Sequence, residues 1–276
     1  MKLDIQAVCH KGMVRENNED ALSIGGLFIR DDSYSITVNT PEEGFFYLFV
    51  SDGMGGHENG EEASATTLEC LREHFDAGRI SEEDFEEDLR RSVHNISDRL
   101  NSLAQERGQE HPMGCTLTGV VWHYGTIRAI NAGDSRTFRF RNGILRPLTT
   151  EDTERGLTGD PSASKFLLNC VGGGCEGRLT IESLDGKLMA GDRVLICSDG
   201  LTDMVAEDEI ETILNDGCVT AGQVHDTDYG SENSIDGAQS DTDCDRKDMT
   251  ISTLFRTACE NGGADNISII LATVLG

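Results

Sequence analysis

The sequence lacks any apolar run approaching the ~20 residues that a membrane-spanning helix requires. Its first residues, Met1–Gln6, contain no apolar stretch of the kind found in a signal peptide. Basic residues are scarce: 23 Lys and Arg stand against 50 Asp and Glu, which gives a formal net charge of −27. So large an acidic excess disfavours nucleic acids and anionic membranes as partners. We therefore expect a protein of the cytoplasm that binds neither nucleic acid nor membrane.

Cysteine pairing motifs are also missing. The cysteines number 9, which is odd, and they form no CxxC pair and show no regular spacing. A chain of 276 residues can bury a substantial core without disulfide bonds. We therefore expect these cysteines to be reduced and structural.

The chain does contain a set of acidic residues beside glycines, spread over almost its whole length. Some follow apolar runs: Phe45–Val50 ends before Asp52, and Val194–Ile196 ends before Asp199. Each of these carboxylates is expected where a strand leaves the core. Hard divalent cations take oxygen ligands, and two such ions about 3.5 to 4 Å apart can hold both oxygens of an in-line phosphoryl displacement. The pattern indicates a metal-dependent phosphohydrolase.

Five ordered segments around these acids carry a closer likeness. They are Val14–Asp20 (VRENNED), Ser51–His57 (SDGMGGH), Gly133–Arg136 (GDSR), Ser198–Asp203 (SDGLTD) and Asp265-Asn266. In this order they resemble the PP2C (PPM) family of metal-dependent protein serine/threonine phosphatases, of the bacterial single-domain type. The likeness runs from about Gln6 to Val274. Because motifs from both ends must meet in one site, we expect a single domain over residues 1–276.

The strand patterns favour hairpins over βαβ units. Hairpins are predicted to turn at Gly125 and at Asn142-Gly143, the latter a strong hairpin signal. Three helices are predicted in separate blocks. The first begins at about Glu61, the second has Ser81 as its N-cap and an apolar face over 85–103, and the third spans 251–258. A last strand, Ile267–Val274, follows the third helix. Such segregation predicts an α+β layered domain. The resemblance implies an antiparallel β-sandwich flanked by helix pairs, in four layers, α-β-β-α.

Two segments fall outside this pattern. Residues 218–248 are rich in Asp, Ser, Thr, Gly and Gln with few apolar residues, so they cannot bury enough surface to offset ordering. We expect a disordered acidic insertion there. The segment from Leu148 to Ser164 lacks the His that usually follows Leu-Thr in the family, and the resemblance implies that it is the flap controlling substrate access.

The resemblance also implies the metal ligands. Asp52 would bridge two Mn²⁺ or Mg²⁺ ions, and Asp199 and Asp265 would complete the ligands of one of them. The Gly53 carbonyl would serve the other ion, together with Glu19, either directly or through a water. Glycine beside Asp52 lets backbone and substrate approach closely.

Further acids have more than one reading. Asp20 would hold a water or orient a ligand. Asp134 and Asp203 match positions that help Asp199 to hold a third ion in bacterial relatives. Alternatively, Asp134 is a strand-end acid paired with Arg136, and Asp203 is a turn acid or the cap of the next helix.

Arg15 is the candidate phosphate holder, because its planar guanidinium matches two phosphate oxygens. A surface ion pair with Glu16 or Glu19 is the alternative. By resemblance, a water shared by the two ions attacks phosphorus in line while Arg15 helps to hold the charge. The substrates would be phosphoproteins made by a serine/threonine kinase of the same cell. Met54 stands where some eukaryotic relatives have a His, so the general acid is unassigned.

Two other functions compete with this one. Cys9 and Arg15 satisfy the C-x5-R spacing of cysteine phosphatases, but Val8 precedes the cysteine and the acidic Glu16 follows the arginine. A strand-packing Cys9 fits better. A metal-binding scaffold without turnover is the non-enzymatic alternative, although every expected ligand position holds a suitable residue. The sequence contains no indication of the oligomeric state.

Overall fold

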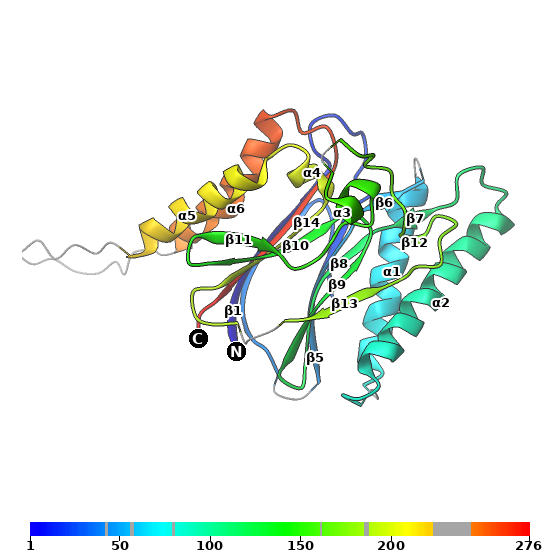
Figure 1. Ribbon diagram of the computed structural model, residues 1–276, viewed down its shortest axis with the longest axis horizontal. Helices are drawn as coiled ribbons and strands as arrows, with labels where there is room; N and C mark the ends of the chain where they lie inside the picture. The colour runs from blue at the N-terminus through cyan, green and yellow to red at the C-terminus, as the bar shows by residue number, and fades with distance from the viewer. Residues whose placement is uncertain (42–43, 56–57, 79–80, 161, 185–187, 223–243) are drawn as a thin grey trace, which may run out of the picture.

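Two antiparallel six-stranded sheets form the centre of the molecule (Figure 1). The computed structural model describes residues 1–41, 44–55, 58–78, 81–160, 162–184, 188–222 and 244–276. In spatial order, the first sheet consists of β11 (Ile144–Pro147), β10 (Arg136–Arg141), β14 (Arg193–Cys197), β15 (Ile267–Val274), β1 (Lys2–His10) and β4 (Asp32–Asn39). The first strand of the chain therefore pairs with the last.

The second sheet faces the first. In spatial order it consists of β13 (Thr180–Ser183), β9 (Thr126–Ala132), β8 (Leu117–His123), β5 (Phe45–Ser51), β2 (Ala21–Ile24) and β3 (Leu27–Ile29). A third, three-stranded sheet consists of β12 (Val171–Gly172), β7 (Gly114–Cys115) and β6 (Gly53–Met54). This small sheet directly follows Asp52, so it lies at the end of the sandwich where the acidic motifs gather.

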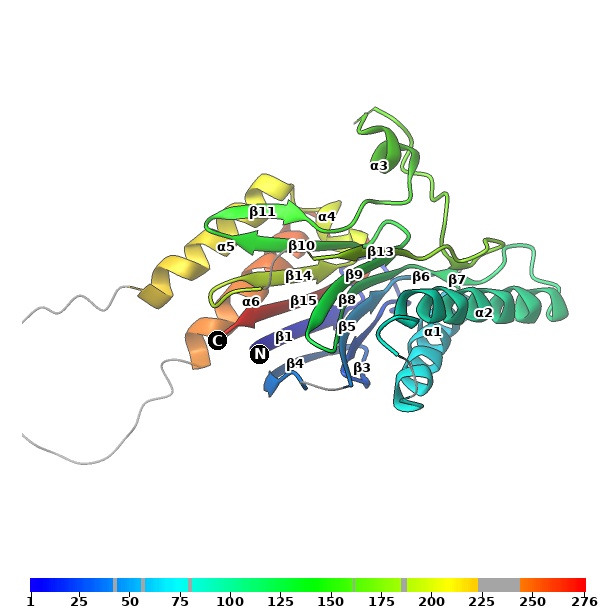
Figure 2. The same ribbon diagram turned by 60° about the horizontal axis from the view of Figure 1, so that its bottom comes forward.

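Helix pairs cover both outer faces (Figures 1 and 2). The second sheet packs against α1 (Glu58–Asp76) and α2 (Phe85–Glu106), and the first against α5 (Glu207–Gly222) and α6 (Cys244–Glu260). Two short helices, α3 (Glu154–Thr158) and α4 (Asp199–Thr202), lie in the connections. The predicted α+β sandwich with four layers, α-β-β-α, is confirmed.

Alternation of side chains along the central strands explains the layering. In β15, Ile270, Ala272 and Val274 pack between the sheets, whereas the alternate residues Ile269 and Leu271 pack under α5 and α6. Strand β5 behaves in the same way, with its alternate residues shared between the inter-sheet core and the core under α1 and α2. Such strands are buried on both faces, since successive side chains point to opposite sides of a sheet.

Both predicted hairpins are confirmed. β8 and β9 pair antiparallel across Tyr124-Gly125, and β10 and β11 pair across Asn142-Gly143. In each turn both central residues have positive φ, 47° and 77° in the first and 51° and 79° in the second. This is the backbone that a two-residue hairpin needs to follow the twist of its strands, and Asn and Gly adopt it readily.

The predicted cap of α2 is wrong by one turn. The helix begins at Phe85 with Asp84 at its N-cap. The Ser81 hydroxyl instead accepts a hydrogen bond from the Asp84 N–H at 3.2 Å and donates to Asp84 Oδ2 at 2.8 Å. Ser81 therefore stabilises the turn before the helix, and sequence alone could not separate that turn from the helix itself.

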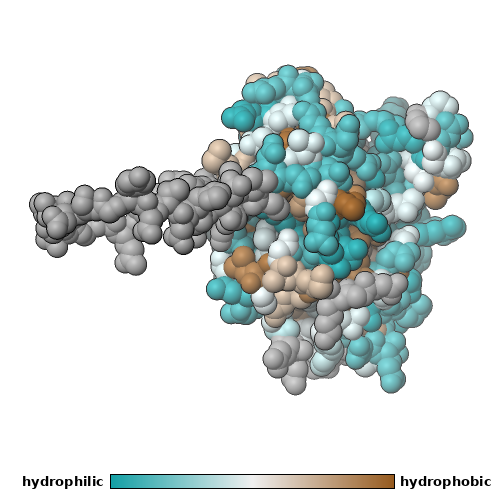
Figure 3. All heavy atoms as spheres, turned by 60° about the vertical axis from the view of Figure 1, so that its left-hand side comes forward, coloured by the Kyte–Doolittle hydropathy of each residue, from teal (hydrophilic) through white to brown (hydrophobic). Residues whose placement is uncertain are grey.

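Both ends of the range 218–248, expected to be a disordered acidic insertion, are helical. Helix α5 continues to Gly222 and α6 begins at Cys244, so both helices enter that range. The rest of the expected insertion, 223–243, lies outside the described residues. No helix in the described part of the chain is both long and apolar enough to cross a membrane. The face shown in Figure 3 is mostly hydrophilic, with scattered hydrophobic residues.

Replacing Phe49 tests the core under α1 and α2. This side chain is fully buried and stacks on Tyr47 with ring centroids 4.9 Å apart. We expect Phe49→Ala to lower the free energy of unfolding, measured by urea denaturation, by about 3 to 5 kcal/mol. Phe166→Ala is the matched control, because Phe166 is 75% exposed. Equal losses from the two variants would contradict this description of the core.

Candidate active site

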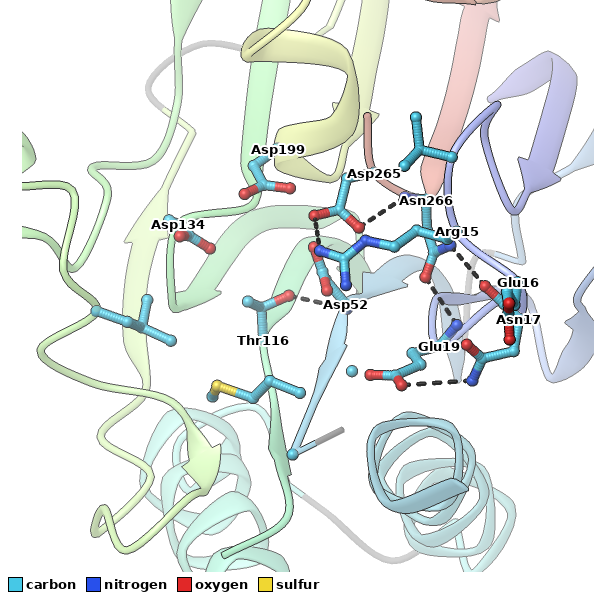
Figure 4. A pocket seen from close by; sticks show the side chains of 15 residues that line it. Arg15, Glu16, Asn17, Glu19, Asp52, Thr116, Asp134, Asp199, Asp265 and Asn266 are labelled. Atoms are coloured by element: carbon cyan, nitrogen blue, oxygen red, sulfur yellow. Dashed lines mark hydrogen bonds and ion pairs between the residues drawn. The ribbon is translucent and has the colours of Figure 1, made fainter. Parts of the chain in front are cut away.

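One end of the sandwich collects the loops that carry the acidic motifs. Strand β5 ends beside Asp52, β14 ends just before Asp199, and Asp265 comes just before β15. The loop after β1 brings Arg15 and Glu19 to the same end. These segments enclose a pocket of about 620 Å³, seen in Figure 4.

Most of the predicted site residues line this pocket. They are Arg15, Glu19, Asp52, Gly53, Asp134, Asp199 and Asp265. Two predicted residues do not line it. Asp20 is fully buried behind the pocket, where its Oδ2 accepts a hydrogen bond from the Ser198 hydroxyl at 2.8 Å. Asp203 follows α4 as its C-cap and makes an ion pair with Lys165.

The backbone of Asp52 is fixed on both sides by Thr116. The Asp52 N–H donates to Thr116 Oγ1 at 3.0 Å, and the Asp52 carbonyl accepts from the Thr116 N–H at 2.8 Å. Thr116 Oγ1 also lies 2.7 Å from Ser135 Oγ. The Asp52 side chain therefore projects from a rigid strand end. Sequence analysis missed Thr116, and no local pattern around it signals this role.

Asn266 positions the loop that carries Glu19. Its Oδ1 accepts from the Glu19 N–H at 2.8 Å, and its Nδ2 donates to the carbonyls of Lys11 at 3.0 Å and Asn17 at 2.9 Å. The Ser64 hydroxyl donates to the Glu19 carbonyl at 2.6 Å. The Asp265-Asn266 motif was recognised in the sequence, but only the structure reveals that its amide ties the N-terminal loop to β15.

Glycine is required where the backbone passes close to these loops. A Cβ atom on Gly53 would lie 2.1 Å from the Gly60 carbonyl oxygen and 2.5 Å from the Glu19 carbonyl oxygen. A Cβ on Gly60 would lie 2.2 Å from Glu19 Oε2. The two glycines thus make room for the Glu19 carboxylate beside β6, as close approach of backbone requires.

The ion pairs around the pocket differ from the pairs that the sequence suggested. Arg15 pairs with Asp265 at 2.6 Å (Figure 4). Arg136 pairs with Glu151 at 3.5 Å and Glu207 at 2.6 Å, both distant in sequence from Asp134. Asp203 ends α4 and pairs with Lys165, which fits a turn acid rather than a cap of α5.

The carboxylates of the pocket destabilise one another's charged forms. Burial, together with neighbouring aspartates, raises the pKa of Asp52 well above its usual value. Burial, followed by repulsion from Asp134 and Asp203, raises the pKa of Asp199 to about 7. Burial is also the main cause that raises the pKa of Asp134 and of Asp20 to about 6. A cation placed among these groups would favour their ionised forms.

The pocket fits divalent cations by its donor chemistry. Within the described residues, the buried Oδ1 atoms of Asp20 and Asp199 have no hydrogen-bond partner. The lining carboxylates supply the oxygen ligands that Mg²⁺ and Mn²⁺ prefer. In the same part of the chain, no three acidic, His or Cys side chains are gathered tightly enough to chelate one ion as they stand. The volume suits ions that keep several waters, as Mg²⁺ does.

Cys9 has the properties of a structural thiol. It is 1% exposed in β1, away from the residues that line the pocket. Its sulfur lies 3.3 Å from Asn18 Nδ2 and 3.3 Å from Ser268 Oγ, which both donate to it. Burial raises the pKa of Cys9 to about 11. The thiolate that a cysteine phosphatase requires is therefore disfavoured.

Comparison with known proteins shows which family the chain belongs to. The family described as protein phosphatase 2C matches residues 25–228. The serine/threonine phosphatase stp of Listeria monocytogenes is 30% identical over 217 residues, which cover 74% of this chain and 80% of that protein. The chain therefore belongs to the protein phosphatase 2C family.

Solved structures share the fold over nearly the whole chain. The serine/threonine phosphatase of S. agalactiae superimposes with a TM-score of 0.73 at 20% identity, covering 99% of each chain. The catalytic domain of the phosphatase PstP, in complex with two manganese ions, superimposes with a TM-score of 0.68 at 25% identity over 100% of both chains. The four-layer arrangement is thus the one found in this family.

The crowding of carboxylates predicts a pH-dependent stability without metal. Because the pKa values of Asp20, Asp134 and Asp199 are raised on folding, the folded chain binds more protons than the unfolded chain. In EDTA the free energy of unfolding should therefore fall from about pH 4, where these groups ionise in the unfolded chain, to about pH 7, where they have ionised in the folded chain. Saturating Mn²⁺ should remove most of the fall. Urea denaturation across this range measures both effects.

Asp199→Asn is the control for this experiment, since it removes one titrating group. The variant should show a shallower fall of stability with pH in EDTA than the wild-type protein. Stability that stays flat or rises over this range in EDTA would contradict the electrostatic description of the pocket.

Proposed function

We propose that this chain hydrolyses phosphoserine and phosphothreonine in proteins as a metal-dependent phosphatase of a single domain. The observation that carries the proposal is the convergence of carboxylates from five separated segments on one pocket with Arg15. Membership of the protein phosphatase 2C family and the two manganese ions in the PstP structure support it. The stp relative is named a serine/threonine phosphatase.

The proposed ligands follow from where the side chains lie. Asp52 projects between the two sides of the pocket and would bridge two ions. Asp199 and Asp265 on one side would complete one ion, and Glu19 on the other side (Figure 4) would hold the second together with the carbonyl of Gly53, which lies beside the Glu19 backbone. When bound, such ions lower the pKa of a coordinated water and balance the charge of the phosphoryl group. Either Mn²⁺ or Mg²⁺ suits these oxygen ligands.

Asp20 would act from behind the pocket. Its carboxylate is buried, and its Oδ2 is held by the Ser198 hydroxyl, next to Asp199 in the sequence. Since it does not line the pocket, we assign it to holding a water or to orienting its neighbours.

Arg15 would bind the substrate phosphate. Its side chain is 53% exposed at the mouth of the pocket and pairs with one oxygen of Asp265. An incoming phosphate offers a stronger, bidentate partner for the guanidinium. If Asp265 binds a metal ion, the arginine is released for the substrate, so the observed ion pair is compatible with both roles.

A third ion would need a rearrangement. Asp134 lines the pocket near Asp199, but Asp203 is engaged by Lys165. A third cation at Asp134 and Asp203 must therefore displace the Lys165 ammonium. We propose this site as weaker than the other two.

The expected partners are phosphoproteins made by a serine/threonine kinase of the same cell. We expect the phosphatase to act in the cytoplasm. With a net charge of −27, the protein should repel anionic substrates except where cations offset its charge. Arg15 and the proposed metal ions place that offset at the pocket.

The test is hydrolysis of p-nitrophenyl phosphate and a phosphothreonine peptide by the wild-type protein and by Asp52→Asn, with Mn²⁺, with Mg²⁺ and with EDTA. We expect turnover with metal, none with EDTA, and a loss on the order of 100-fold or more in Asp52→Asn, because the bridging charge is removed. Asp98→Asn is the matched control, since Asp98 is 66% exposed on α2.

Cys9→Ser and metal binding separate the alternatives. Cys9→Ser should remain active. Activity that persists in EDTA but is lost in Cys9→Ser would show that the Cys9 thiol, and not a metal site, is the catalytic group. A folded protein that binds Mn²⁺ in calorimetry but hydrolyses neither substrate would be a scaffold rather than a phosphatase.

A further inference from the structure

Two cysteines outside the pocket meet across a glycine-rich turn. Cys170 comes just before β12, and Cys175 follows Gly173 and Gly174. The Cys175 N–H donates to the Gly172 carbonyl at 2.8 Å and closes the turn. The Cys170 thiol donates to the same oxygen at 3.3 Å. The two residues thus converge on one atom, and Cys175 is, after burial, the first neighbour that raises the pKa of the Cys170 thiol.

Helix α2 holds this turn in place. Ser97 Oγ accepts from the Gly172 N–H at 2.8 Å and donates to the Cys175 carbonyl at 2.9 Å. Asn101 accepts from the Gly174 N–H at 2.8 Å and donates from Nδ2 to the Cys175 carbonyl at 2.9 Å. The approach of the two thiols is therefore built into the fold rather than left to a free loop.

We propose that Cys170 and Cys175 are a modification site, at which a peroxide converts the two thiols into a reversible disulfide. The two thiols differ in access, since Cys170 is 2% exposed and Cys175 is half-buried. Cys175 therefore meets hydrogen peroxide first. In the cytoplasm, disulfides that do form are typically transient and regulatory, which suits a reversible bond.

The reaction proceeds in two steps. The Cys175 sulfur attacks one peroxide oxygen, an S–O bond forms, the O–O bond breaks, and the products are a sulfenic acid and water. The Cys170 sulfur then attacks the Cys175 sulfur, the S–S bond forms, the S–O bond breaks, and a second water leaves. Each thiol proton ends in one of the two waters, and the peroxide is the oxidant.

Burial decides which thiol starts the reaction. Desolvation, reinforced by the neighbouring Cys175, raises the pKa of Cys170 well above its usual range. The Cys170 thiolate is therefore disfavoured, which makes Cys170 a poor first target for the peroxide. The pair thus consists of a partly exposed thiol that meets the oxidant and a sheltered thiol that resolves it.

The turn is connected to the pocket on two sides. Asn169, next to Cys170, donates to Asp152 Oδ2 at 2.7 Å, and the same oxygen accepts from the Gly133 N–H at 2.9 Å, just before Asp134. Strand β12 also pairs with β7, which pairs with β6 directly after Asp52. Closing the disulfide should disturb both connections and slow turnover, an effect that rests on the proposed function.

Peptide mapping of the whole protein without reductant, after hydrogen peroxide and alkylation, tests the modification. We expect one Cys170–Cys175 disulfide and a loss of two thiols from the total of 9. Cys175→Ser should prevent it, and Cys170→Ser should leave a Cys175 sulfenic acid that dimedone traps. Cys259→Ser is the matched control, because Cys259 is also half-buried but lies in α6. Recovering both thiols alkylated at a dose that oxidises Cys259 would overturn the proposal.

Turnover of p-nitrophenyl phosphate tests the link to the pocket. Oxidised wild-type protein should lose about tenfold or more, as small displacements of catalytic groups do, and dithiothreitol should restore it. Cys175→Ser should keep its activity under the same treatment. A disulfide without loss of turnover would contradict the link. A protein that shows no turnover before oxidation would refute the proposed function instead. The peptide map would still show whether the Cys170–Cys175 disulfide forms.

Discussion

Repulsion among buried carboxylates is the constraint on which the site depends. Burial raises the pKa values of Asp52, Asp134 and Asp199, and repulsion from neighbouring acidic side chains adds to each shift. Within the described residues that line the pocket, Arg15 is the one cationic side chain, and it pairs with Asp265. A site of this kind stores electrostatic free energy that divalent cations release on binding. Folding and metal binding are therefore expected to be coupled.

The sandwich keeps these charges together against their repulsion. Pairing of β1 with β15 brings the two ends of the chain side by side, and backbone hydrogen bonds then fix the loops. Thr116 holds the backbone of Asp52 through its N–H and its carbonyl, and Asn266 ties the Glu19 loop to β15. Supports of this kind keep the acidic side chains close together, because hydrogen bonds of the backbone hold the loops that carry them in place.

Sequence patterns anticipated what depends on local chemistry. The Asn142-Gly143 pair specifies a hairpin because both central residues of the turn need positive φ, which Asn and Gly adopt readily. The position of Asp52 at the end of a strand follows from the apolar run before it. Contacts between residues far apart in the sequence could not be predicted from these local patterns. Nothing near Thr116 signals its bonds to Asp52, and the ion pair of Lys165 with Asp203 joins residues that lie 38 positions apart in the sequence. The prediction of Ser81 as the helix cap was wrong because serine stabilises both an isolated turn and the first turn of a helix.

Anomalous diffraction from crystals grown with Mn²⁺ tests the central claim most directly. The account predicts two manganese peaks about 3.5 to 4 Å apart, with an oxygen of Asp52 between them, Asp199 and Asp265 on one ion, and the Gly53 carbonyl on the other. Arg15 should then have left Asp265. Manganese found elsewhere on the acidic surface, with the Arg15–Asp265 ion pair intact and no peak beside Asp52, would contradict the account.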